Sequence, residues 1–267
     1  MEYKLIAMDM DGTLLNSSKD VSERTIKAIE RAKNKGTHVV LATGRVLKSA
    51  QHYADKLKLK NYIIASNGAI VINGDNEIVY SQPLDFDRIN MILNIGDKYN
   101  IYSHFYDEEA LYTNKYVNEI VDYYLGREPD FKINIFNNLD EIIQNNNLNV
   151  YKFLFLDNEP QKLIRLSEEL KAVENINITK SFRNNLEVMD INASKGQALE
   201  YLGNKLNIPR ESIIAVGDNE NDLSMLNYAG LGIAMGNGED IVRKSADYVT
   251  LDNDNDGVAS VIEKFIL

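Results

Sequence analysis

An apolar run near the beginning of the chain, Leu5-Ile6-Ala7-Met8, leads directly into Asp9-Met10-Asp11-Gly12-Thr13. Runs with an apolar residue at nearly every position are typical of strands that are buried in a parallel sheet. Asp9 and Asp11 therefore follow the carboxyl end of a strand, where open α/β sheets bind their ligands. Because two close carboxylates repel each other, this pair is expected to need a cation or a shared proton.

Short apolar runs alternate with amphipathic stretches on both sides of the chain's middle section, which indicates a parallel sheet covered by helices. In the first part we expect strands at Tyr3–Met8, Thr37–Ala42 and Tyr62–Ala65, helices at Ser22–Lys35 and Arg45–Leu57, and a hairpin formed by Ile70–Ile72 and Ile78–Tyr80. In the last part we expect strands at Ile213–Val216, Leu231–Met235 and Tyr248–Leu251, and helices at Ser194–Leu206, Asn219–Leu226, Asp240–Ser245 and Gly257–Phe265.

The middle section mixes helices with short strands and is rich in Tyr and Asn. Its pattern predicts helices at Phe86–Tyr99, Lys115–Leu125 and Gln161–Val173, and strands at Ile101–Tyr106, Leu111–Thr113, Val150–Leu156 and Ile176–Lys180. We therefore expect an α/β fold in which residues 1–82 and 187–267 form a Rossmann-like core domain with a parallel sheet. Residues 83–186 would form an inserted α/β cap domain.

Composition excludes several classes of protein. The chain has 267 residues, a net charge of −11 and no cysteine, so disulfide scaffolds, thiolate metal sites and cysteine catalysis are ruled out. The negative charge disfavours nucleic acid as a partner. Neither a signal peptide nor an apolar stretch long enough for a membrane is expected, which favours a cytoplasmic protein. His38, His52 and His104 lack the spacing of a zinc site.

Three further polar motifs follow predicted strands or open a helix. Thr43-Gly44-Arg45 comes after a strand and offers a hydroxyl and backbone N–H groups to an anion, although alone it could be an ordinary turn. Lys195-Gly196 places a cation at a helix start, where a bound anion would explain it, although alone it could be a solvated lysine. Gly217-Asp218-Asn219-Glu220-Asn221-Asp222 brings hard oxygen ligands that suit Mg²⁺, or simply an acidic helix cap.

Taken together, the four motifs resemble those of the haloacid dehalogenase superfamily phosphatases, in particular the Cof-like branch (type IIB) with a large inserted cap. Asp9-Met10-Asp11-Gly12-Thr13-Leu14-Leu15 matches the first motif of the family, and the other three motifs follow in the family's order. Minor signatures are also similar, among them Ser66-Asn67-Gly68-Ala69 and Ala234-Met235-Gly236-Asn237-Gly238. The resemblance covers both halves of the core, whereas the cap matches only in length and position.

The resemblance implies Asp9 as the nucleophile that forms an aspartyl-phosphate. Asp11 would be the general acid and then the base, so we expect its pKa to be raised. Mg²⁺ would be held by the carboxylates of Asp9 and Asp218 and by the backbone carbonyl of Asp11. The phosphate would be bound by Asp9, Thr43, Gly44, Lys195 and Asn221, with Thr43 and Lys195 counted among the catalytic residues and Asp222 in support. Arg45 could contact the substrate or form a structural ion pair.

The activity implied is Mg²⁺-dependent hydrolysis of small phosphorylated metabolites, such as sugar phosphates, by a monomer or weak homodimer without nucleic-acid or membrane partners. Transfer of the phosphoryl group to another alcohol, as in a phosphomutase, is the first alternative. A non-catalytic protein that binds a phosphorylated ligand is the second. A receiver domain would be about half as long. Cap residues that could contact the leaving group are His104, Tyr106, Tyr112 and Lys115.

Overall fold

The computed structural model describes residues 2–115, 117–118, 132–137, 139, 142, 148–180 and 183–267, and the chain divides into two compact units. Unit 1 comprises Met1–Arg45, Ala50–Ser81 and Ser194–Leu267, and unit 2 comprises Val46–Ser49 and Gln82–Ala193. Unit 2 continues past residue 186, the predicted end of the insert, because Asn185–Asp190 is a strand of its sheet. The roles assigned to the two domains, catalysis and substrate specificity, stay predictions.

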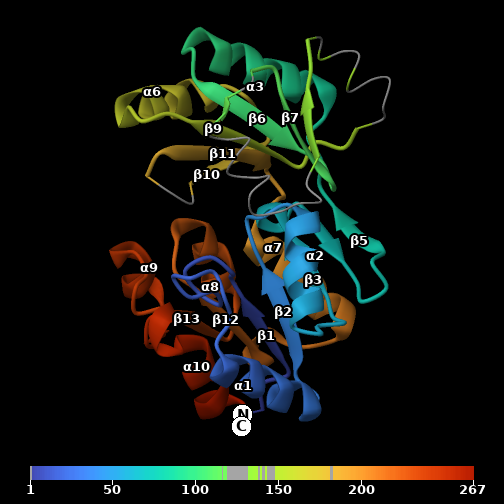
Figure 1. The fold of residues 1–267 in the computed structure, drawn as a ribbon, viewed down its shortest axis with the longest axis vertical. Coiled ribbons are helices and arrows are strands. Elements are labelled where there is room, and N and C mark those ends of the chain that lie inside the picture. Colours follow the sequence, from blue (N-terminus) through green and yellow to red (C-terminus); the bar gives the residue numbers. More distant parts are fainter. Residues whose placement is uncertain are drawn as a thin grey trace. The chain divides into compact units, whose positions relative to one another are not determined.

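Unit 1 is built on an eight-stranded sheet in the order β14-β13-β12-β1-β2-β3-β4-β5 (Figure 1). The neighbours from β14 to β3 pair in parallel, and the β4–β5 hairpin continues the sheet in the antiparallel sense. The predicted parallel core is confirmed. The strands are β1 (Leu5–Met8), β2 (His38–Ala42), β3 (Ile63–Ala65), β4 (Ile70–Ile72), β5 (Ile78–Ser81), β12 (Ile213–Gly217), β13 (Leu231–Ala234) and β14 (Tyr248–Val249).

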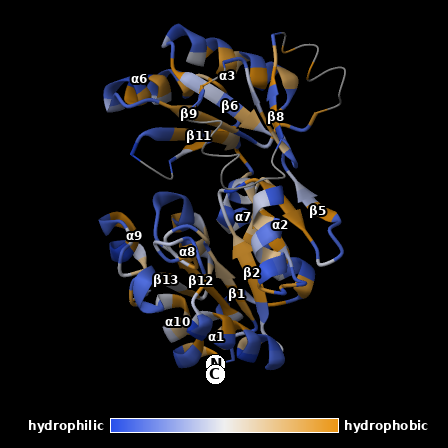
Figure 2. Ribbon diagram, in the orientation of Figure 1, coloured by the Kyte–Doolittle hydropathy of each residue, from blue (hydrophilic) through white to orange (hydrophobic). Residues whose placement is uncertain are grey.

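Helices of unit 1 pack on this sheet, and its central strands are coloured as hydrophobic in Figure 2. Leu5 and Ala7 of β1 share a buried cluster with Leu199 and Leu202, so α7 covers the face to which they point. Helices α1 and α10 lie side by side (Figure 1). The helices are α1 (Glu23–Asn34), α2 (Leu47–Lys56, which begins in unit 2), α7 (Lys195–Leu206), α8 (Leu223–Tyr228), α9 (Asp240–Ser245) and α10 (Gly257–Phe265).

The loop after β12 differs from the predicted helix Asn219–Leu226. Residues Glu220–Asp222 form a single 3₁₀ turn, and the α-helix starts only at Leu223. The turn forms because the Asp222 side chain accepts hydrogen bonds from the backbone of Asp218 and Asn219, as an N-terminal capping group does.

Unit 2 contains a six-stranded sheet in the order β10-β11-β9-β6-β7-β8, which is antiparallel except for the β7–β8 pair. The elements are β6 (Tyr102–Tyr106), β7 (Ala110–Thr113), β8 (Lys132–Ile135), β9 (Lys152–Leu156), β10 (Ile176–Thr179), β11 (Asn185–Asp190), α3 (Phe86–Lys98) and α6 (Pro160–Leu170). The predicted helix Lys115–Leu125 falls mostly outside the described residues.

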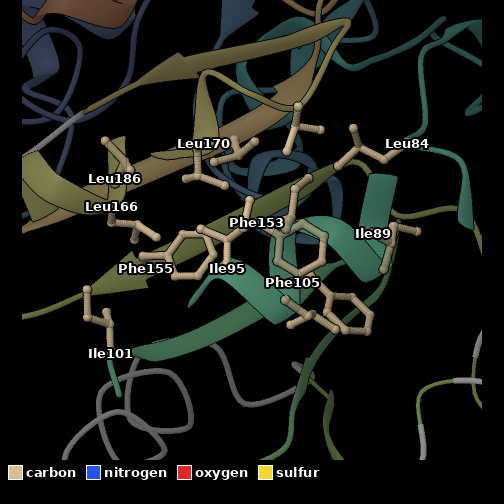
Figure 3. Packing of buried hydrophobic residues seen from close by; sticks show 14 of the residues in the cluster. Leu84, Ile89, Ile95, Ile101, Phe105, Phe153, Phe155, Leu166, Leu170 and Leu186 are labelled. Atoms are coloured by element: carbon tan, nitrogen blue, oxygen red, sulfur yellow. The ribbon is translucent and has the colours of Figure 1, made fainter. Parts of the chain in front are cut away.

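Alternate side chains of the unit 2 strands form a core against α3 and α6 (Figure 3). Phe105, Phe153 and Phe155 are all fully buried, and their rings lie beside Ile95 of α3 and Leu166 of α6. Since successive strand residues point to opposite faces, the side chains of His104 and Tyr106 lie on the face opposite to that of Phe105. Among the described residues, no helix combines the length and the apolar character needed to cross a bilayer.

Candidate active site

Two buried aspartates from neighbouring parallel strands meet at the carboxyl edge of the unit 1 sheet. Asp9 follows β1 and Asp218 follows β12, and the backbone N–H of Asp9 extends the pairing by donating to the Val216 carbonyl oxygen at 3.0 Å. Gly12 has φ +83°, and a Cβ there would lie 2.4 Å from Oδ2 of Asp218. A glycine is therefore required at position 12, where the backbone after the first motif passes the Asp218 carboxylate.

Lys195 is the centre of the charge network. Its side chain is 0% exposed, and Nζ lies 2.6 Å from Oδ1 of Asp9 and 2.6 Å from Oδ1 of Asp222. Burial lowers the pKa of this ammonium, but the charges and hydrogen bonds of Asp222 and Asp9 outweigh it, so the net shift is upward and Lys195 stays protonated. The anions expected to compensate a cation at this helix start are thus carboxylates of the protein itself.

Asp222 holds the loop together and is fully buried. While Oδ1 accepts from Lys195, Oδ2 accepts from the backbone N–H groups of Asp218 at 2.8 Å and Asn219 at 3.0 Å. Both of its oxygens are therefore engaged by protein donors. The supporting role of Asp222 stays a prediction.

The carboxylates suit a hard divalent cation. Ligand atoms of Asp9, Asp218 and Asp222 all lie within 4.8 Å of one another. Burial, and then mutual repulsion among the carboxylates, raises the pKa of Asp9 to about 7 and that of Asp218 to about 8. Oxygen ligands that resist ionising together fit Mg²⁺, because a bound cation would relieve both the desolvation and the repulsion.

The surroundings of Asp11 differ from those expected for a general acid. Arg45 donates to both of its oxygens, from Nε to Oδ2 at 2.6 Å and from Nη2 to Oδ1 at 2.8 Å, and Lys19 Nζ lies 2.9 Å from Oδ1. Burial raises the pKa of Asp11, but the hydrogen bonds and charges of Arg45 and Lys19 outweigh it and leave the pKa well below its usual range. The prediction of a raised pKa is wrong for this conformation, in which Arg45 forms an ion pair.

The remaining predicted phosphate ligands meet at a turn after β3. Thr43 is 1% exposed and directly follows β2, and its Oγ1 accepts from the backbone N–H of Arg45 at 3.1 Å. Asn221 donates from Nδ2 to Oδ1 of Asn67 at 3.1 Å. A Cβ on Gly44 would approach the same Asn67 oxygen to 2.7 Å, so both segments lie against Asn67.

Sequence reasoning missed Lys19 and Asn67 as members of the site. For Asn67 a signal existed, since Ser66-Asn67-Gly68 is a polar turn directly after a strand, like the other motifs. Lys19 belongs to the loop after the first motif and has φ 61°, and nothing in the pattern of residues pairs it with Asp11.

The four residues of unit 2 that were predicted to contact a leaving group have different surroundings from one another. His104 Nε2 lies 2.6 Å from the hydroxyl of Tyr106, and burial followed by the charge of Lys152 lowers the pKa of His104 well below its usual value. The ring of Tyr112 instead stacks on the core residue Phe105. Lys115 reaches Asn100 on the exposed surface.

Comparison with known proteins agrees with this fold. A family model described as haloacid dehalogenase-like hydrolase matches residues 6–262, and the chain belongs to that family. The 5-amino-6-(5-phospho-D-ribitylamino)uracil phosphatase YcsE of Bacillus subtilis is 34% identical over 100% of this chain and 97% of its own length. The putative phosphatase YxeH of the same organism is 35% identical over 99% of each chain.

Solved structures align over nearly the whole chain. A haloacid dehalogenase-like hydrolase from Bacillus subtilis aligns over 98% of this chain and 100% of its own, with a TM-score of 0.89 and 31% identity. The type IIB sugar phosphatase BT4131 aligns over 98% of both chains with a TM-score of 0.84 and 23% identity, a likeness of fold.

Proposed function

We propose that the protein is a Mg²⁺-dependent phosphatase that hydrolyses phosphomonoesters of small metabolites through an aspartyl-phosphate on Asp9. The observation that carries the proposal is the position of Asp9, which is buried, bound at Oδ1 by Lys195, and close to Asp218. A carboxylate placed beside one buried ammonium and a second carboxylate suits the transfer of a dianionic phosphoryl group better than a purely structural ion pair.

In the first step, a carboxylate oxygen of Asp9 attacks phosphorus, a P–O bond forms, and the bond to the leaving oxygen breaks. Lys195 offsets the negative charge that Asp9 and the phosphoryl oxygens bring together. The Thr43 hydroxyl and the backbone N–H groups of the turn at Gly44 would bind the phosphoryl oxygens, and Asn221 would add its carboxamide. Water then attacks the phosphorus of the aspartyl-phosphate and releases inorganic phosphate, which restores the Asp9 carboxylate.

Asp11 would donate a proton to the leaving oxygen and later remove one from the attacking water. Its present contacts with Arg45 and Lys19 keep it ionised. Those contacts therefore have to be exchanged during turnover, and an incoming phosphate dianion is a competing partner for both cations.

Mg²⁺ would be held by the carboxylates of Asp9 and Asp218 and by the backbone carbonyl of Asp11. When bound, it supplies charge stabilisation to the phosphoryl group as a Lewis acid. Thr13 and Asn219 each donate to an oxygen of Asp218, at 2.8 Å in both cases, which fixes the orientation of this carboxylate.

We further propose that unit 2 selects the substrate. Relatives that span nearly all of this chain are named for a ribitylaminouracil phosphate. This favours a phosphate ester on a polyol or sugar chain. A cytoplasmic location and a monomeric or weakly dimeric state stay predictions.

The test is release of inorganic phosphate from p-nitrophenyl phosphate, from a panel of sugar phosphates and from 5-amino-6-(5-phospho-D-ribitylamino)uracil, with Mg²⁺ or with EDTA. We expect release that requires Mg²⁺ and falls at least about a thousandfold in Asp9→Asn, because the amide is not a nucleophile. The matched control is Asp20→Asn, an exposed aspartate of the loop that follows the first motif.

Other outcomes separate the alternatives. If a sugar phosphate is isomerised without free phosphate, the protein is a phosphomutase. If wild type neither releases nor transfers phosphate but binds a panel member, it is a binding protein. Release that survives in Asp9→Asn would show that another group is the nucleophile.

A further inference from the structure

The turn after β3 has an unusual backbone. Ser66, Asn67 and Gly68 have φ values of 48°, 56° and 92°, so three consecutive residues are left-handed and two of them carry a Cβ. Left-handed backbone is disfavoured for residues other than glycine and persists only where the surrounding structure imposes it. Residues of this kind are concentrated at functional sites.

The turn is fixed by contacts with two other segments of the site. The backbone N–H of Asn67 donates to the Thr43 carbonyl oxygen at 3.0 Å, and that of Ser66 donates to the Arg45 carbonyl oxygen at 2.8 Å. A Cβ on Gly68 would lie 2.2 Å from the carbonyl oxygen of Ser194, the residue before Lys195. The turn thus lies against both the Thr43 segment and the start of α7.

The Asn67 side chain reaches a third segment. Asn67 is 2% exposed, and its Oδ1 accepts from Nδ2 of Asn221 at 3.1 Å. The oxygen and nitrogen ends of a carboxamide have nearly the same shape and can exchange places by a 180° rotation. An acceptor on one side, here Oδ1 of Asn67, therefore decides that the nitrogen end points toward it. Asn67 therefore fixes the Asn221 amide with Nδ2 toward the Thr43 segment.

A second observation points to a ligand at this place. Oδ1 of Asn221 is buried, and none of the described residues donates to it. The second N–H of Nδ2 lies on the same carboxamide. Buried polar atoms in native proteins are nearly always paired. The second N–H of Nδ2 can therefore donate to a phosphoryl oxygen, whereas Oδ1 is an acceptor that only a donor or a cation at the site would satisfy, and Asn67 sets which way each of them points.

We propose that Asn67 is a positioning residue for phosphate binding, which acts by orienting the Asn221 carboxamide. The inference rests on the proposed function, because it takes a phosphoryl group as the ligand. Gly44 belongs to the same arrangement, because its missing side chain makes room for Oδ1 of Asn67.

The test is a double-mutant cycle on release of phosphate from p-nitrophenyl phosphate with Mg²⁺. The variants are Asn67→Ala, Asn67→Gly, Asn221→Ala and the double variant Asn67→Ala/Asn221→Ala. We expect each single variant to lose about ten- to a hundredfold in kcat/KM, the usual range for a residue that orients a ligand-binding group. Adding Asn67→Ala to Asn221→Ala should change little, because both remove the same oriented amide. Inhibition by inorganic phosphate should weaken in parallel.

Asn67→Gly separates the side chain from backbone strain, because glycine adopts φ 56° freely. The matched control is Asn76→Ala. Asn76 is also left-handed, with φ 63°, and its Oδ1 also accepts from a side-chain amide, Nε2 of Gln51 at 3.0 Å, but on the exposed surface. We expect Asn76→Ala to lower the melting temperature while kcat/KM stays unchanged.

Two results would overturn the inference and leave the proposed function standing. One is wild-type kcat/KM in Asn67→Gly beside a loss in Asn221→Ala. The other is a double variant whose fold losses multiply, because Asn67 would then act independently of Asn221. Phosphate release that persists in Asp9→Asn would instead contradict the proposed function itself.

Discussion

At the scale of single residues, the site depends on how each buried charge is compensated. Lys195 is 0% exposed and has two carboxylate partners, whereas Asp218 faces other carboxylates and is satisfied only by neutral donors from Thr13 and Asn219 among its described hydrogen bonds. The excess of negative charge is thus concentrated between Asp9 and Asp218. A divalent cation and a phosphoryl group together would complete the balance.

Replacing Lys195 should damage both stability and activity. In Lys195→Met, the carboxylates of Asp9 and Asp222 remain buried without their cation, and breaking a buried ion pair costs about 3–5 kcal/mol. Loss of the charge that faces the phosphoryl group should lower kcat by about a hundredfold or more. Urea unfolding and phosphate release from p-nitrophenyl phosphate, both measured below the melting transition, check the two parts.

Lys152→Met is the matched control for Lys195→Met. Lys152 also forms a buried ion pair, with Glu187 at 2.9 Å and side-chain exposures of 5% and 3%, but it lies in unit 2. We expect a comparable loss in the free energy of unfolding with p-nitrophenyl phosphate hydrolysis retained. Equal losses of activity in the two variants would show that Lys195 acts only through stability.

At the scale of elements, the start of α7 positions Lys195. Ser194 is the N-cap, and its Oγ accepts from the backbone N–H of Gln197 at 3.1 Å. Lys195 is the first residue of the helix, so fraying of the first turn would displace its ammonium from Asp9. The capping serine therefore affects both the helix and the charge network.

We expect Ser194→Ala to lower stability by about 1 kcal/mol through loss of the cap. It should also lower kcat several-fold, because the first turn of α7 carries Lys195. Ser22→Ala at α1 is the matched control, since Ser22 caps the backbone N–H of Thr25 in the same way and also donates to a second side chain. Thermal unfolding and kcat check the pair, and an equal drop in kcat for both variants would contradict the role of the cap.

The parallel core and the positions of its acidic residues could be predicted from the sequence, because buried parallel strands are continuous apolar runs and their carboxyl ends share one edge of the sheet. That reasoning placed Asp9, Asp11 and Asp218 after β1 and β12, as observed. The predicted direction of the Asp11 pKa shift was wrong, because this pKa depends on Arg45 and Lys19, whose contacts with Asp11 arise only when the loops fold. The predicted helix Asn219–Leu226 starts later than expected, at Leu223, because Asp222 holds the preceding residues in a 3₁₀ turn.

At the scale of the whole molecule, the raised pKa values make stability depend on pH. Asp9 and Asp218 titrate near 4 when unfolded, but at about 7 and about 8 when folded. Between about pH 4 and pH 8, the folded state therefore binds more protons than the unfolded state, and the free energy of unfolding falls as pH rises. Carboxyl groups whose pKa is lowered on folding act oppositely, but mainly below pH 4.

We expect the melting temperature of the protein in EDTA to fall between pH 6 and pH 8.5, and Mg²⁺ to restore it increasingly as pH rises. The reason is that the cation binds the ionised carboxylates and competes with protons for them. Thermal unfolding across this range, with and without Mg²⁺, is the measurement. In Asp218→Asn both effects should shrink, and a Mg²⁺ effect that is unchanged in this variant would place the cation elsewhere.

The pairing of β1 with β12 has a consequence for synthesis on the ribosome. Leu5 pairs with Ile213, so the strand that carries Asp9 leaves the ribosome about 10–40 s before its neighbour, at 5–20 residues per second. During that interval unit 2, continuous from Gln82 to Ala193, has all of its own strands. One edge of β1 meanwhile lacks its partner strand, and an open strand edge is a point at which a growing chain can pair with another chain.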